Sequence, residues 1–74
     1  MKKILTEILT EYEVASSKYP QFHSTHEGYA VIKEELDELW DMVKANKGLS
    51  GNSEMRKEAI QIAAMAMRFI KDLC

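Results

Sequence analysis

Oxygen-bearing side chains gather in two places along this chain of 74 residues. Residues 34–38 read Glu-Glu-Leu-Asp-Glu, and Glu58 and Gln61 follow on a later segment. On an α-helix, side chains three positions apart share a face, as Glu35 and Glu38 would. Glu58 and Gln61 have the same spacing, so the two pairs can converge from two helices on one site. Carboxylate and amide oxygens at that site would hold Mg²⁺, or Mn²⁺ in its place, together with a nucleotide phosphate.

A solvated helix face is the simpler interpretation of the acidic stretch. Six of the twelve acids lie between Glu27 and Asp41, where Lys33 is the only base. Like charges one helical turn apart repel each other by roughly 0.2–0.5 kcal/mol per pair, and interleaved lysines usually relieve that repulsion. Divalent cations would relieve it equally well. Composition leaves both interpretations open.

Three amphipathic segments must position these residues. Apolar side chains recur at helical spacing over residues 2–17, from about Ser24 to about Asn46, and over residues 53–73. Pro20 excludes a helix between the first two segments. Ser24 and Glu27 form a capping-box pattern, which predicts the start of the second helix. We therefore expect a single all-α domain over residues 1–74, with Gly48 and Gly51 ending the second helix.

The third segment predicts an oligomer. Its apolar stripe is widened by Ile60, Ala64 and Met67, so its middle is apolar on nearly every side. A helix of this kind is buried on more than one side, and a chain with three helices needs a neighbouring subunit to provide the second cover. A domain this short also rarely reaches more than about 3–5 kcal/mol of stability alone. We expect a dimer or tetramer that forms a helical bundle.

Charge and composition exclude several partners. The formal net charge is -2 and no stripe of Lys or Arg is present, which argues against binding of a nucleic acid polymer. The longest apolar run, residues 62–67, is too short to span a bilayer, so no membrane partner is expected. The single cysteine, Cys74, favours a reducing cytoplasm. His23 and His26 have no partner at the spacing of a zinc site.

Four further residues are candidates for substrate binding. Arg68 follows Gln61 along one edge of the third helix, where it would donate two hydrogen bonds to a phosphate, and Lys57 could assist. Phe22 and His26, on either side of the predicted helix start, could stack on a nucleobase. The alternatives stay open: Arg68 can extend to solvent or form an ion pair between subunits, and Phe22 can simply cover the helix ends.

The chain resembles the small MazG-like proteins of phages and bacteria, within the all-α nucleoside triphosphate pyrophosphatases. Residues 26–40, HEGYAVIKEELDELW, and residues 58–66, EAIQIAAMA, carry the resemblance, which covers nearly the whole chain. It implies Mg²⁺-dependent hydrolysis of a nucleoside triphosphate to the monophosphate and pyrophosphate.

By position, the resemblance makes Glu35, Glu38 and Glu58 metal ligands. It makes Glu34 a neighbouring acid that orients water or a second metal. Gln61 stands where the family's second motif has Asp, and its amide oxygen can ligate Mg²⁺ but adds no negative charge. Two other functions remain: a protein that sequesters a nucleotide or cyclic nucleotide signal without cleaving it, and a helical interaction module with solubilising acids.

Overall fold

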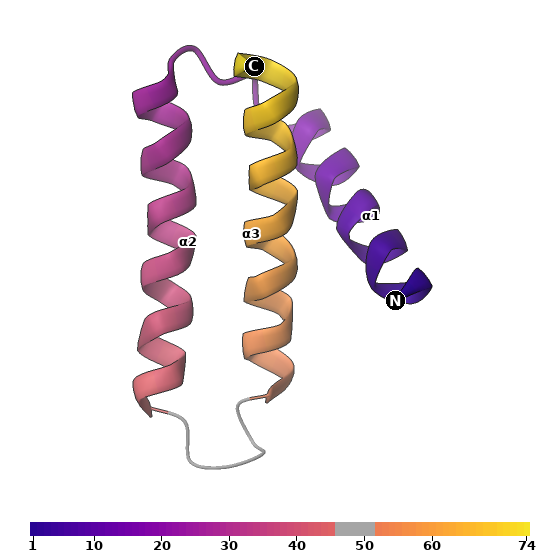
Figure 1. The fold of residues 1–74 in the computed structure, drawn as a ribbon, viewed down its shortest axis with the longest axis vertical. Coiled ribbons are helices and arrows are strands. Elements are labelled where there is room, and N and C mark those ends of the chain that lie inside the picture. The colour runs from indigo at the N-terminus through magenta and orange to yellow at the C-terminus, as the bar shows by residue number, and fades with distance from the viewer. Residues whose placement is uncertain (46–51) are drawn as a thin grey trace.

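The computed structural model describes residues 1–45 and 52–74, which form three helices and contain no strand. The helices are α1 (Lys2–Lys18), α2 (Thr25–Ala45) and α3 (Asn52–Leu73) (Figure 1). The all-α prediction is confirmed, and the predicted limits agree with the observed ones to within a residue or so. The predicted end of the second helix at Asn46, and its break at Gly48 and Gly51, lie outside the described residues.

Helix α3 is the central element of the fold. Helices α2 and α3 run antiparallel, side by side, while α1 packs against α3 at an angle and runs away from α2 toward its N-terminal end (Figure 1). Helix α3 therefore contacts both of the other helices. Helices α1 and α2 of the same chain thus cover two sides of α3, so its broad apolar surface does not by itself require the neighbouring subunit that the sequence pattern predicted.

Local chemistry determines how α1 ends and α2 begins. Tyr19 has the extended backbone conformation (φ -123°, ψ 146°) that a following proline favours. At the start of α2, the Ser24 hydroxyl accepts a hydrogen bond from the Glu27 backbone N–H at 3.1 Å. The Glu27 carboxylate accepts one from the His23 backbone N–H at 2.6 Å. The predicted capping box is thus formed, with its second bond directed one residue upstream of Ser24.

A small core joins the three helices and the connection between α1 and α2. Its buried apolar members are Ala15, Phe22, Ala64 and Met65. Helix α2 packs closely on α3 at Gly28, where an added Cβ would lie 2.6 Å from the Phe69 ring. The absence of a side chain at this position allows the close packing of α2 on α3.

One apolar side of α2 is left uncovered. Tyr29, Leu36 and Val43 recur every seven residues, and Trp40 lies between the last two. All four side chains are exposed, with Tyr29 at 63% and Trp40 at 57%. Within the described ranges, no helix combines the length and the apolar character needed to cross a bilayer.

Candidate metal centre

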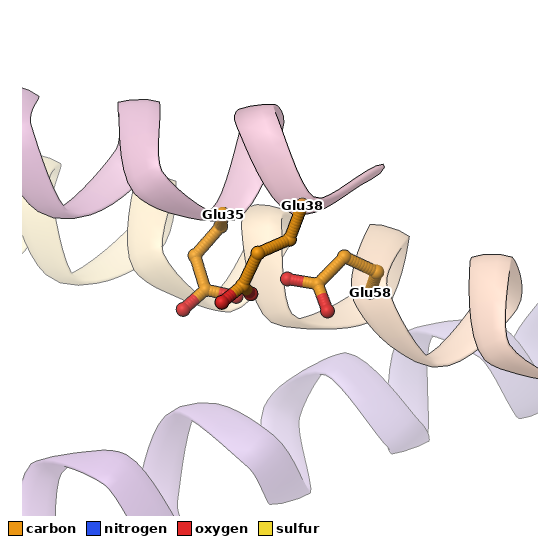
Figure 2. A group of neighbouring side chains, drawn as sticks. All are labelled: Glu35, Glu38 and Glu58. Atoms are coloured by element: carbon orange, nitrogen blue, oxygen red, sulfur yellow. The ribbon is translucent and has the colours of Figure 1, made fainter. Parts of the chain in front are cut away.

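Three glutamates from two helices converge on one point. Glu35 and Glu38 project from α2, and Glu58 projects from the facing side of α3 (Figure 2). One carboxylate oxygen from each residue can be chosen so that all three lie within 4.8 Å of one another. This group, the glutamate cluster, contains three of the four residues predicted from the spacing to be metal ligands.

The three side chains of the cluster differ in their exposure to solvent. Glu58 is only 7% exposed, Glu35 is half-buried and Glu38 is exposed. Oε2 of Glu35 and Oε1 of Glu58 are buried and have no hydrogen-bond partner among the described residues. A buried oxygen without a partner is costly, because it has lost water and gained nothing in exchange. The cluster therefore requires something that compensates these oxygens.

Two glutamates of the cluster have raised pKa values. The pKa of Glu58 is raised to about 7, mainly by burial and next by the neighbouring Glu35, against an opposing effect of the hydrogen bond with Glu38. The hydrogen bond with Glu58 and the charge of Glu58 raise the pKa of Glu38 as well. No Lys, Arg or His of the described ranges forms an ion pair with the cluster. A proton on Glu58 or a bound cation would reduce the repulsion among these carboxylates.

A cleft adjoins the cluster and includes Glu35 in its wall. This central cleft has a volume of about 460 Å³ and is enclosed by all three helices and the connection between α1 and α2. Apolar side chains of Ala15, Val31 and Met65 line part of it. Its volume falls within the range of roughly 300–1,000 Å³ that is usual for small-molecule sites.

Arg68 is the only basic side chain that the described part of the chain places in the central cleft. It is 3% exposed, and its guanidinium lies 4.6 Å from the centre of the Phe22 ring. Nη2 donates a hydrogen bond to the Pro20 carbonyl at 2.7 Å, and Nη1 makes a weak contact with Met65 Sδ at 3.8 Å. Nε has no partner within the described residues. A buried guanidinium without a carboxylate partner is well suited to binding an anion.

Comparison with known proteins gives no assignment. No protein-family model matches the chain, and no curated protein or solved structure matches it either. The geometry of the site and the sequence motifs therefore provide the basis for a proposed function.

The other predicted site residues divide into two groups. Glu34, Gln61 and Phe22 line the central cleft together with Glu35 and Arg68. His26 and Lys57 do not line it. His26 is exposed in the first turn of α2, and Lys57 lies in a separate groove between α1 and α3.

Sequence reasoning missed the contribution of α1. Glu11 and Ala15, one helical turn apart, form part of the cleft wall, and Tyr19 and Pro20 continue it. Glu11 is half-buried, unlike its exposed neighbour Glu13. The available signal was the position of Glu11 one turn before Ala15, a small residue of the kind that permits close helix packing.

Proposed function

We propose that this protein is a Mg²⁺-dependent nucleoside triphosphate pyrophosphohydrolase, which converts an NTP or dNTP to the monophosphate and pyrophosphate. The convergence of Glu35, Glu38 and Glu58, with two buried oxygens lacking partners, is the observation that carries the proposal. The resemblance of residues 26–40 and 58–66 to MazG-like pyrophosphatases supports the same reaction.

The donor set suits a hard divalent cation. Three carboxylates supply only oxygen ligands, and Mg²⁺ prefers oxygen, retains several waters and is commonly completed by substrate phosphates. Glu35, Glu38 and Glu58 would hold the ion, with the amide oxygen of Gln61, which lines the adjoining cleft beside Glu35, as a further donor. When bound, Mg²⁺ neutralises phosphate charge and lowers the pKa of a coordinated water.

Glu34 is the residue that we propose acts on the attacking water. It is exposed and lies in the cleft wall next to Glu35. In the proposed reaction, water attacks phosphorus, the bridging P–O bond between the α and β phosphates breaks, and pyrophosphate leaves with the electron pair. The Glu34 carboxylate orients the water and accepts its proton.

Arg68 has two roles in this proposal. Its buried guanidinium provides positive charge toward the phosphates, which is needed because the cleft wall otherwise carries Glu11, Glu27, Glu34 and Glu35. Its bond to the Pro20 carbonyl also holds the connection between α1 and α2 at the edge of the cleft. Loss of Arg68 would therefore weaken both phosphate binding and the shape of the site.

The assembly is proposed to be a homo-oligomer. The exposed stripe of Tyr29, Leu36, Trp40 and Val43 on α2 has the seven-residue repeat of a helix that packs against another helix. A second copy can cover this stripe with its own α2, which produces a self-complementary helical interface of the kind seen in twofold dimers.

Nucleotide binding without turnover is the second candidate. Gln61 favours it, because a neutral amide replaces the fourth acid of the metal site and reduces the charge available to hold Mg²⁺. The intact glutamate cluster favours hydrolysis, since a protein that only sequesters a nucleotide does not require three converging carboxylates.

Product analysis distinguishes these functions. Purified protein is incubated with a panel of ribo- and deoxynucleoside triphosphates and Mg²⁺, then denatured, and the recovered nucleotides are separated by chromatography. Monophosphate with pyrophosphate supports the hydrolase, and intact nucleotide recovered from washed protein supports sequestration. If neither product nor retained nucleotide is found, the helical interaction module is the function that remains.

A matched pair of variants locates the activity. Glu58→Gln removes a charge from the cluster, whereas Glu54→Gln removes one from an exposed position a turn earlier on α3. We expect hydrolysis to fall by at least about a hundredfold in the first variant, equivalent to loss of a metal-site interaction of roughly 2.7 kcal/mol. The second variant should retain wild-type activity. Equal activities would contradict the proposed site.

A further inference from the structure

Glu11 is the acid of the central cleft that no other role accounts for. It lies between the cleft and the neighbouring groove that holds Lys57 and lines both from α1. It is half-buried and forms no hydrogen bond or ion pair with any described residue. Glu27 already accepts the His23 backbone N–H at the start of α2. Glu34 and Glu35 belong to the metal and water end of the proposed site. Glu11 is left as a free acceptor in the wall.

The surroundings of Glu11 suit a planar ring with polar edges. Ala15, Val31 and Met65 give the same cleft an apolar lining on which a base can pack. Arg68, 3% exposed with Nε unpartnered, adds a buried cation to that lining. A ligand with a flat base and an anionic group would therefore satisfy the apolar lining, the Arg68 cation and the Glu11 acceptor together.

The chemistry of a carboxylate restricts which base fits. An ionised carboxylate only accepts hydrogen bonds, and its two oxygens best match two adjacent N–H donors. Guanine has such a pair in N1–H and the 2-amino group. Adenine and cytosine place a ring acceptor beside the amino group, and uracil and thymine place carbonyls on both sides of one N–H. We infer that Glu11 selects guanine nucleotides as the substrate, an inference that rests on the proposed pyrophosphohydrolase function.

Inosine triphosphate provides the matched ligand, because it differs from GTP only in lacking the 2-amino group. The experiment measures kcat/KM for GTP, ITP, ATP and UTP with Mg²⁺. One hydrogen bond to a charged acceptor that a substrate cannot make corresponds to roughly a tenfold loss or more, so GTP should exceed ITP by at least that factor. ATP and UTP should be poorer than GTP.

Two variants on the same helix test the residue. In Glu11→Gln, one acceptor oxygen becomes an amide donor that opposes the guanine donors, so the GTP to ITP ratio should fall to near one. Glu13→Gln changes an exposed acid two positions away and should keep the wild-type ratio. Helical circular dichroism spectra establish that both variants are folded.

A binding measurement separates this inference from the proposed function. Calorimetry with GMP and IMP in EDTA requires no hydrolysis, and GMP should bind the wild type at least about tenfold more tightly than IMP. If no triphosphate is hydrolysed yet GMP is preferred, the pyrophosphohydrolase fails and the guanine site stands. Hydrolysis with equal rates for GTP and ITP would overturn the inference alone. A GTP to ITP ratio that is unchanged by Glu11→Gln would overturn it too.

Discussion

The buried carboxyl of Glu58 makes stability depend on pH in a direction opposite to most acidic groups. Its pKa is raised from 4.5 to about 7, mainly by burial, so the folded protein holds this proton more tightly than the unfolded chain does. Between these values the folded state binds more protons, and the free energy of unfolding therefore falls as pH rises. The metal-free protein should be most stable with Glu58 protonated, and its stability should level off above about pH 7.

The size of the effect follows from the two pKa values. A rise from 4.5 to about 7 corresponds to roughly 3 kcal/mol, at about 1.4 kcal/mol for each pH unit. Glu58→Gln removes the ionisation, so in EDTA this variant should exceed the wild type by up to about 3 kcal/mol at pH 8 and by little at pH 5. For a domain of this size each kcal/mol is about 4–8 °C in Tm, so the difference at pH 8 corresponds to up to roughly 12–24 °C.

Thermal unfolding from pH 5 to pH 8, followed by circular dichroism, measures this difference. Mg²⁺ should replace the proton, so adding it should raise the wild-type Tm at pH 8 far more than at pH 5, and should leave Glu58→Gln nearly unchanged. Glu54→Gln, with its exposed acid, serves as the control and should follow the wild type. A Glu58→Gln variant that is less stable than the wild type at both pH values would refute the reasoning.

Three other changes have definite expected outcomes. Gly28→Ala should destabilise the protein by up to about 2 kcal/mol in chemical unfolding. Overpacking against Phe69 costs roughly 1–3 kcal/mol, which exceeds the gain in helix propensity of about 1 kcal/mol. Equal or greater stability would show that α2 can shift. Leu36→Lys should lower the mass measured by sedimentation to that of a monomer if the α2 stripe is the interface, and an unchanged mass would exclude that stripe. Arg68→Lys keeps the charge but loses the planar fork, so KM for the triphosphate should rise about tenfold or more; an unchanged KM would remove Arg68 from phosphate binding.

Much of the fold and the core of the site could be predicted from the sequence because both depend on local spacing. Helical periodicity gave the three helices, and the Ser24–Glu27 pattern gave the start of α2. The spacing of Glu35 and Glu38 placed both on one face of α2. Glu58 borders the apolar stripe of α3, so the antiparallel packing of α3 on α2 brought it opposite them.

Other features depended on packing that spacing does not encode. Lys57 precedes Glu58 directly, and adjacent positions on a helix point about 100° apart, so Lys57 faces the groove with α1 instead of the cluster. Glu11 entered the cleft wall because of the angle at which α1 meets α3, which periodicity does not determine. The burial of Arg68 depends on the connection between α1 and α2 folding over it, with the Pro20 carbonyl as acceptor.

The last turn of α3 supports the wall of the central cleft through a residue that does not itself line the cleft. The Asp72 carboxylate accepts the Phe22 backbone N–H at 3.0 Å and so fastens the connection that borders the central cleft. Phe22 in turn lies under the Arg68 guanidinium. Removal of the final residues, or a fusion that unwinds them, would therefore release Phe22 and Arg68 together and alter the central cleft while leaving the glutamate cluster intact. Shortening or tagging this end of the chain would thus change the wall of a cleft formed mostly by residues far from it in the sequence.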